Sequence, residues 1–274
     1  MTDPLGRQLY EASKGGRVSE VSSLLKDNPG LNVNWTDSDG WTPLHDASFH
    51  RHVEVIKLLF AHPDININVK NKDGATPFSL ACERGRVSVV RLMLKDPRVD
   101  VTLSDNNKCT PLWWASWKGG LEVVKWLIAS NRDLGDISAN AIDWSDGEEY
   151  SALEIARQEG KTEVMSLLEL FTNNPAQTRH EVRVKLGVLD ELSAEVFAMT
   201  VFLCDELLQL KSASNPDDAH ATRFFTIVKR LPMELQMVLC HRAVGSMKQN
   251  VLHKDSEAAF KSLASILLLL SQSE

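Results

Sequence analysis

The stretch Asp39-Gly40-Trp41-Thr42-Pro43-Leu44-His45-Asp46-Ala47 decides the fold, because its central part returns at a fixed interval. Threonine, proline and an apolar residue recur at 76–78 and 110–112, 34 residues apart, and an alanine follows at the same offset each time. Weaker copies lie at 9–12 and 153–156. Self-similarity at such a period is typical of stacked helical repeats, in which each unit buries its apolar face against its neighbours.

Each strong copy carries the signals of a helix that begins at its threonine. A threonine hydroxyl accepts a bond from a free backbone N–H, and a proline in the next position has no N–H to lose. The alanine has a small side chain, so it predicts that this inner helix packs closely against its partner helix. The helix end is predicted at a glycine, which tolerates a left-handed backbone, at Gly16, Gly85, Gly120 and Gly160. Apolar residues at helical spacing then predict an outer helix within 55–59, 89–94, 123–128 and 164–168.

The stretch 39–47, with His52, Glu54, Val55 and Ile56 behind it, resembles the pattern of the ankyrin-repeat family. The resemblance covers residues 5–171 as five repeats. It implies an all-α solenoid of helix-turn-helix units with β-hairpin-like turns, followed in this chain by a C-terminal helical domain. It also implies that the chain works by binding another protein or a peptide in the concave groove of the array.

Several positions depart from the family pattern. Arg51 and Lys108 stand where the pattern has glycine. The histidine found at His45 is replaced in later repeats, by Ser79, Trp113 and Glu154. The fifth repeat has Ser151-Ala152 instead of Thr-Pro, and it begins seven residues late, because Ala115 and Ala156 are 41 residues apart rather than 34. Insertions in a solenoid often lie on its binding face, so the region 137–150 is a candidate binding segment.

The repeat pattern stops at Phe171, which predicts a repeat domain over 1–175 and a helical domain over 176–274. Within the second domain the sequence predicts helices over 188–210, 224–231 and 232–245, and a last helix from Asp255 or Ser256 to about residue 270, with a loop at 212–218. Two roles stay open for it. It caps the open face of repeat five, since repeat arrays need capping for solubility, or it recruits a second partner.

The second role would make the chain a substrate receptor of a ubiquitin ligase. Leu231-Pro232-Met233-Glu234-Leu235 looks like the opening of an F-box, a short helical module that recruits such a ligase, although the likeness fades after about ten residues. The segment also departs from the SOCS-box pattern, because four residues rather than three separate Leu235 from Cys240.

Composition narrows the function classes. A net charge of -7 and a pI near 5.7 argue against nucleic acid as a partner, since nucleic-acid binding requires a basic face. The four cysteines lie far apart, which fits neither a disulfide framework nor a zinc site and suits a reducing compartment. The N-terminus lacks the apolar core of a signal peptide, and the longest strongly apolar stretch, Val196–Cys204, is nine residues, too short to span a membrane. We therefore expect a soluble protein of the cytoplasm, with the nucleus as the alternative.

The sequence offers no chemistry beyond binding. It contains no Gly-x-Ser-x-Gly, no glycine-rich phosphate loop and no His-Glu-x-x-His, so we expect no catalytic residue and no cofactor. His45, His50 and His52 lie close together, but two of them occupy family positions, and we expect hydrogen bonding rather than metal ligation. Oligomeric state is left open.

The resemblance also indicates which residues face the groove: the turn residue just before the threonine and two residues late in each inner helix. By position these are Trp41, Phe49, His50, Ala75, Glu83, Arg84, Cys109, Trp117, Lys118, Tyr150, Gln158 and Glu159. Trp114 lies three residues from Trp117 and therefore on the same side of its helix, whereas Trp113 and Trp126 are expected in the core. Trp144 stands in the inserted region with several acids.

Aromatic and arginine side chains on a concave face are typical of binding hot spots, so this set predicts the partner-binding site. Acidic residues at Asp37, Asp39, Asp73 and Asp105 on the turns predict a partner segment with basic flanks.

Overall fold

The computed structural model describes residues 3–204, 222, 224–228, 231, 233–244, 251, 255, 259 and 261. The chain divides into two compact units, Met1–Arg179 and His180–Glu274. This division falls inside helix α11 (Pro175–Leu186). The expected domain boundary at residue 175 stays a prediction about how the chain folds.

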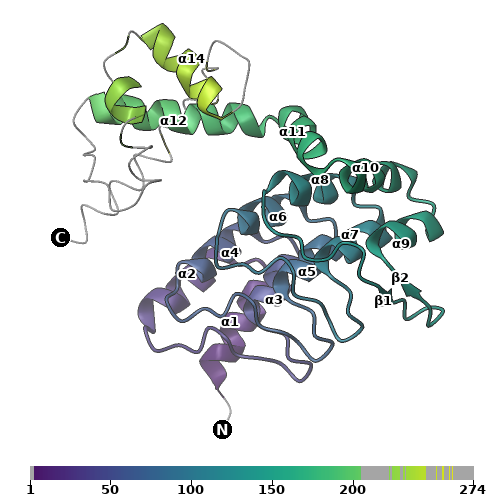
Figure 1. Cartoon of the computed structure of the whole chain (residues 1–274). Coiled ribbons are helices and arrows are strands. Elements are labelled where there is room, and N and C mark those ends of the chain that lie inside the picture. Colours follow the sequence, from purple (N-terminus) through teal and green to yellow (C-terminus); the bar gives the residue numbers. More distant parts are fainter. Residues whose placement is uncertain are drawn as a thin grey trace. The chain divides into compact units, whose positions relative to one another are not determined.

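The first unit is an array of helix pairs in two rows (Figure 1). The inner row consists of α1 (Pro4–Lys14), α3 (Pro43–Phe49), α5 (Pro77–Glu83), α7 (Pro111–Lys118) and α9 (Ala152–Gln158). The outer row consists of α2 (Val18–Asp27), α4 (Val53–Phe60), α6 (Val87–Leu94), α8 (Leu121–Ala129) and α10 (Thr162–Asn173). Each helix packs on its partner in the other row and on the next helix of its own row. The expected all-α repeat solenoid is confirmed.

The inner helices begin as their sequences predict. Thr42, Thr76 and Thr110 are the N-caps of α3, α5 and α7, and each side chain accepts a bond from a backbone N–H three residues on. Ser151 caps α9 in the same way, and Glu154 bonds back to the Ser151 N–H at 2.9 Å. The fifth repeat therefore lacks Thr-Pro but keeps the capping box of the second and third repeats, in which two free donors are satisfied reciprocally.

Four of the inner helices are followed by a residue with positive φ at the position where the repeat pattern places a glycine. The values are 66° at Gly16, 62° at Gly85 and 65° at Gly160, and Arg51 adopts the same conformation with φ of 67°. In the fourth repeat the prediction of Gly120 is wrong. Gly119 has φ of 73°, whereas Gly120 has φ of -74° and stands at the N-cap of α8. The repeat period places the left-handed residue at 119, 34 residues after Gly85.

Each turn between these repeats contains one side-chain oxygen that accepts two backbone hydrogen bonds. Oδ1 of Asp37 accepts from the backbone N–H of Asp39 and Trp41. Oδ1 of Asn71 and Oδ1 of Asp105 accept from the equivalent pair of N–H groups one and two repeats later. These side chains satisfy buried donors that a turn leaves unpaired, which is why short polar residues recur there.

Successive turns are also bonded to each other. The N–H of Lys72 donates to the carbonyl of Asp39, and the N–H of Asn106 donates to that of Asp73, both at 3.0 Å. The inserted region ends this series with a hairpin. Its strands β1 (Ala141–Ile142) and β2 (Glu149–Tyr150) pair antiparallel, with Ala141 opposite Tyr150. Ile142 N–H then donates to Asn107 at 3.0 Å, so the insertion continues the row of turns.

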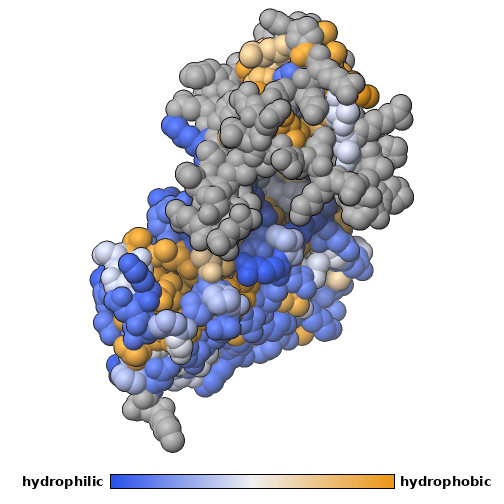
Figure 2. Space-filling view, turned by 90° about the vertical axis from the view of Figure 1, so that its left-hand side faces the viewer, coloured by the Kyte–Doolittle hydropathy of each residue, from blue (hydrophilic) through white to orange (hydrophobic). Residues whose placement is uncertain are grey.

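The core lies between the two rows and contains the repeat alanines and the apolar faces of the outer helices, including Ala47, Ala81, Ala115, Val90 and Val124. Trp113 is 1% exposed, as expected for a core residue. Trp126 does not join it: its ring is half-buried on α8, with the Arg91 guanidinium 4.3 Å from its centroid. Figure 2, which views the molecule from the side of α1 and α2, shows a largely hydrophilic surface on this unit with hydrophobic areas between.

The second unit is mostly helical where it is described. It contains the end of α11, α12 (Val188–Cys204), a helical stretch at 224–228 and α14 (Met233–Ala243). Helix α12 packs on α14, and Thr200 Oγ1 lies 3.9 Å from Cys240 Sγ. Residues 255, 259 and 261 of the expected last helix are helical, while the expected loop at 212–218, Pro232 and Gly245 lie outside the described residues. Among the described helices, none combines the length and hydrophobicity that a membrane span requires.

Candidate protein-binding groove

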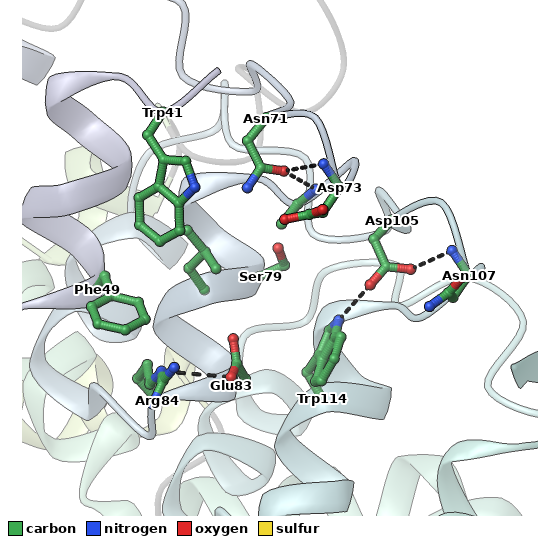
Figure 3. A pocket seen from close by; sticks show the side chains of 12 residues that line it. Trp41, Phe49, Asn71, Asp73, Ser79, Glu83, Arg84, Asp105, Asn107 and Trp114 are labelled. Atoms are coloured by element: carbon green, nitrogen blue, oxygen red, sulfur yellow. Dashed lines mark hydrogen bonds and ion pairs between the residues drawn. The ribbon is translucent and has the colours of Figure 1, made fainter. Parts of the chain in front are cut away.

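A cavity of about 290 Å³ lies where the turns meet the inner helices α3, α5 and α7 (Figure 3). Trp41 and Phe49 stand on one side of it, and Trp114 stands on the opposite side. The remaining lining residues are Asn71, Asp73, Ala75, Ser79, Leu80, Glu83, Arg84, Asp105 and Asn107. The cavity therefore combines large apolar rings with carboxylates and one guanidinium.

Trp41 is held from two directions. Its backbone N–H donates to Asp37 Oδ1 at 2.8 Å, which anchors the turn. Its ring packs edge-on against Phe49, with centroids 5.5 Å apart, and is tilted against His45 at 5.9 Å. Ring contacts of this geometry are favourable beyond their buried area, so the indole is a preformed wall of the cavity.

Phe49 and Arg84 link the second repeat to the third. The Arg84 guanidinium lies 4.2 Å from the centroid of the Phe49 ring, a cation–π distance, and its Nε lies 3.5 Å from a carboxylate oxygen of Glu83. All three side chains line the cavity, as Figure 3 shows. The stacked guanidinium keeps hydrogen-bond donors at the cavity edge, where they can meet a carbonyl of a bound segment.

Asp105 fixes the opposite wall. Its Oδ2 accepts from the indole Nε1 of Trp114 at 2.9 Å, while its Oδ1 accepts from the backbone N–H of Asn107 and Cys109. Burial raises the pKa of the Asp105 carboxyl, and these donated hydrogen bonds oppose the rise. The carboxylate thus holds the turn and the tryptophan in one arrangement.

A second aromatic cluster continues from Trp114 toward the inserted hairpin. The ring of Trp117 lies 5.3 Å from that of Trp114 and 6.1 Å from that of Trp144, and it stacks on buried Trp113 at 6.2 Å. The Lys118 ammonium lies 3.6 Å from the Trp117 ring centroid. Trp144 is 64% exposed, so the row of rings ends in a side chain that is open to solvent.

Tyr150 supports this cluster from the hairpin. Its carbonyl accepts from Trp113 Nε1 at 2.9 Å, and its hydroxyl donates to Asp146 Oδ2 at 3.0 Å. That hydrogen bond, the first of several causes, raises the pKa of the Tyr150 hydroxyl above its usual value. The hairpin therefore places Tyr150 and Trp144 beside the fourth repeat rather than leaving them in a separate loop.

A second cavity, of about 330 Å³, borders the first at Trp41 and Phe49. Its other lining residues are Tyr10, Lys14, Asp37, Asp39, Asp46 and His50. Because they share Trp41 and Phe49, we treat the two cavities as one groove that runs from α1 to α7. The second cavity, which His50 lines, is the first-repeat end of this groove.

The structure places half of the expected binding residues along this groove, whereas Trp117, Lys118, Tyr150 and Trp144 line neither cavity and belong to the aromatic cluster beside it. Trp41, Phe49, Glu83, Arg84 and Trp114 line the first cavity. Cys109 is a correction: it is fully buried against Trp113 and Ile155, because the fourth turn is covered by the inserted hairpin. Ala75 is nearly buried and forms cavity wall only. Exposed Gln158 and Glu159 line neither cavity.

Sequence reasoning missed several lining residues: Tyr10, Asp46, Asn71, Ser79, Leu80 and Asn107. The sequence holds a signal for two of these residues, Asn71 and Asp46. An Asp or Asn precedes each repeat threonine by five residues, at 37, 71 and 105, which is the spacing of the turn acceptor. Asp46 stands where the next two repeats have Leu80 and Trp114.

The three clustered histidines make backbone hydrogen bonds. His45 Nε2 lies 3.1 Å from the Ala75 carbonyl, His50 Nδ1 lies 3.0 Å from the Asp46 carbonyl, and His52 Nε2 lies 3.0 Å from that of Lys14. Burial lowers the pKa of His45 to about 4, so its ring is neutral near pH 7. Within the described part of the chain, no group of three His, Cys, Asp or Glu side chains is arranged to hold a metal.

Stacked helix pairs joined by bonded turns, with a groove along the turns and inner helices, define a helical-repeat solenoid. Residues 7–71 and 64–141 each match the family model described as ankyrin repeats (3 copies), and the repeat unit belongs to the ankyrin-repeat family. The C-terminal segment is not assigned to any family. No curated protein matches the chain. Ankyrin repeats are generally protein–protein interaction modules and are typically not enzymes.

Proposed function

We propose that this protein is an adaptor that holds a segment of a partner protein in the groove between Trp41 and Trp114. The observation that carries the proposal is a pair of preformed indole walls facing one cavity, with carboxylates at its rim. Tryptophan is enriched among residues that dominate binding energy, because it offers large contact area and has few rotatable bonds. The adaptor would act in the cytoplasm, and its partner segment would carry basic flanks toward exposed Asp39 and Asp73.

The test compares two tryptophans of the repeat unit. Trp41 lines both cavities, whereas Trp126 is half-buried on outer helix α8 and lines neither. Partners captured by the wild-type chain are identified by mass spectrometry, produced in pure form and titrated by calorimetry. We expect Trp41→Ala to weaken binding by about 2 kcal/mol or more and Trp126→Ala to change it by less than about 0.5 kcal/mol. Equal affinities for both variants would place the binding site elsewhere.

A second proposal gives the C-terminal unit its own partner, a ubiquitin-ligase scaffold. What supports it is the exposure of Met233 (61%) and Leu235 (51%) at the start of α14, within the segment that looks like an F-box opening. Both side chains belong to the first turn of α14, and large apolar side chains exposed at a surface are typical of interaction sites when they form a patch. The full chain and a Met233→Ser, Leu235→Ser variant would be probed with purified ligase scaffold subunits. Binding that the variant loses supports the proposal, and absence of binding by the wild-type chain rejects it.

A further inference from the structure

The cavity at the first-repeat end of the groove contains a carboxylate with one buried oxygen that has no hydrogen-bond partner among the described residues. Asp46 lies in the middle of α3, is 2% exposed and lines this cavity. Within the described part of the chain, its Oδ2 is buried and accepts no hydrogen bond. A buried acceptor without a donor is costly, and a charged one more so. Such a group in a native structure requires an explanation.

The repeat fold does not require an acid at this position. Asp46 follows its N-cap Thr42 by four residues, and the residues at that step in the next three repeats are Leu80, Trp114 and Ile155. All three are apolar, and Ile155 is completely buried. An apolar side chain therefore satisfies the packing of the inner helix, and the carboxylate must be explained by something outside it.

The Tyr10 hydroxyl is shared between two carboxylates, those of Asp37 and Asp46. Tyr10 Oη donates its single proton to Asp37 Oδ2 at 3.0 Å. Burial, followed by hydrogen bonding to Asp46 and Asp37 and by repulsion from their charges, raises the pKa of the Tyr10 hydroxyl well above its usual range. The phenol stays protonated, and its single proton can serve only one of these two carboxylates at a time.

The surrounding charges are unbalanced. Three carboxylates, those of Asp37, Asp39 and Asp46, line the cavity with Lys14 and His50. The Lys14 ammonium lies 5.6 Å from the centroid of the Tyr10 ring and, among the described residues, forms no ion pair with these acids. His50 Nδ1 is 3.6 Å from Asp46 Oδ1, beyond hydrogen-bond range, and lies 3.0 Å from the Asp46 carbonyl instead. The cavity thus carries excess negative charge, and one of its three carboxylates is buried.

The walls of the cavity favour a flat cation. Trp41 and Phe49 supply aromatic surface, and Phe49 already carries one guanidinium, that of Arg84, at 4.2 Å. A guanidinium is planar, stacks on rings and donates several hydrogen bonds in a fixed fork, whereas an ammonium is a more strongly hydrated point charge. A cavity of about 330 Å³ has room for such a group and its aliphatic stem.

We propose that this cavity binds an arginine side chain of the partner, with Asp46 as the buried acceptor and Asp39 at the rim. The proposal rests on the proposed function, because it assumes that the groove holds a partner segment. It adds the identity of one residue of that segment and the place in the groove where the residue docks.

The first experiment needs no partner. The ¹⁵N-labelled full chain is titrated with N-acetyl-arginine amide, N-acetyl-lysine amide and N-acetyl-citrulline amide, the last being nearly isosteric with arginine and uncharged. We expect millimolar binding of the arginine compound, with shift changes at the Trp41 indole and at the amides of 39–50. Binding should be at least about tenfold weaker for citrulline and clearly weaker for lysine. Equal binding of citrulline, or no binding of the arginine compound, would overturn the proposal. Equal binding of lysine would overturn the choice of arginine.

Two variants separate recognition from folding. Asp46→Leu copies the residue that the third repeat has at this step, so we expect an unchanged or higher melting temperature together with loss of the arginine-dependent shifts. Asp73→Asn removes the same charge from the other cavity and should leave those shifts intact. A lower melting temperature with unchanged arginine binding in Asp46→Leu would assign Asp46 a purely structural role and contradict the inference.

The same variants distinguish this inference from the proposed function once a partner is known. If Trp41→Ala and Asp46→Leu both weaken partner binding, both stand. If Trp41→Ala weakens binding and Asp46→Leu does not, the groove binds the partner without an arginine in this cavity, and only the inference fails. If neither variant changes affinity, the proposed function fails as well.

Discussion

The carboxylate of Asp105 connects the backbone of a turn to the wall of a binding cavity, because its Oδ2 accepts from Trp114 Nε1 at 2.9 Å while its Oδ1 caps the turn. The equivalent residue one repeat earlier, Asn71, makes the two turn bonds with its amide oxygen. The fold therefore accepts either residue type, and only the bond to the indole depends on the second carboxylate oxygen.

Asp105→Asn should accordingly keep the turn and release the tryptophan. The new amide oxygen still accepts the two backbone N–H groups, but its NH₂ cannot accept from Trp114. We expect the free energy of unfolding to fall by about 1 kcal/mol, the typical value for one hydrogen bond. Chemical denaturation measures it, and the indole N–H resonance of Trp114 should move. The control Asn71→Asp should shift neither that resonance nor the stability comparably. An unchanged Trp114 resonance in Asp105→Asn would contradict the bond.

The neutral, buried ring of His45 should make stability depend on pH. Burial lowers the folded-state pKa to about 4, against about 6.5 in the unfolded chain, so the unfolded state binds more protons between these values. The contribution is complete above about pH 6.5 and is lost as the pH falls toward 4, at most roughly 3 kcal/mol in all. His45→Ser copies the cap of the third repeat, where Ser79 Oγ accepts from the Thr76 N–H. The difference in melting temperature between wild type and variant should shrink across this window. A constant difference from pH 7 to pH 4 would show that His45 does not titrate in this way.

Two glycines with positive φ should respond differently to alanine. A Cβ at Gly74 would lie 2.7 Å from the Asn106 backbone nitrogen, whereas a Cβ at Gly85 would meet nothing within 4 Å. Both changes strain a left-handed backbone, by about 1–2 kcal/mol, and only Gly74→Ala must also push two turns apart. We expect Gly74→Ala to destabilise clearly more than Gly85→Ala in urea unfolding. Equal losses would mean that the turns separate at no cost.

Arg51 occupies the left-handed position that glycine fills in the neighbouring repeats, with φ of 67°. Arg51→Gly removes strain of about 1 kcal/mol, but it also loosens the unfolded chain, which opposes the gain. We expect a small net stabilisation, and the same for Lys108→Gly, where φ is 66°. Thermal unfolding of both variants measures it. A clear loss of stability in Arg51→Gly would show that its side chain makes a contact that the fold needs.

Trp117 should matter for the partner although it lines neither cavity. It joins Trp114 to exposed Trp144, so a bound segment that leaves the cavity toward the hairpin would cross it. We expect Trp117→Ala to weaken partner binding by about 2 kcal/mol. Its packing on Trp113 adds a stability cost of about 1 kcal/mol, which a melting curve records. The affinity of Trp144→Ala for the partner tests separately whether the hairpin end of the aromatic cluster takes part in binding. Unchanged affinity in a folded Trp117→Ala chain would show that the bound segment does not cross Trp117 on its way out of the cavity.

The repeat architecture was predictable because local signals and period agree. Thr42, Thr76 and Thr110 predict where the inner helices begin, because threonine is a good N-cap residue. The family match confirms the resulting fold. Gly120 was chosen wrongly because two glycines stand together and only the period separates their roles.

The binding surface was less accessible to sequence reasoning. Trp41, Arg84 and Trp114 could be placed by position, since each repeat presents the same steps to the groove. Cys109 could not, because its burial depends on an insertion that folds over the fourth turn. The state of Asp46 depends on Tyr10 and Asp37, two residues of other segments that no local pattern brings together.

The backbone hydrogen bonds between successive turns fix the spacing of the turns along the edge of the groove. Asp39 bonds to Lys72, and Asp73 bonds to Asn106, so each tip sits one backbone hydrogen bond from the next. Gly40 and Gly74 let the tips approach closely, because a Cβ there would lie 3.1 Å from the Lys72 backbone nitrogen and 2.7 Å from that of Asn106, respectively. Trp41 directly precedes its repeat threonine, whereas Trp114 follows its own by four residues, so the two rings are separated by two repeats along the turns and by one turn of an inner helix. We therefore expect a bound segment to place its anchoring side chains at the spacing that the bonded turns set.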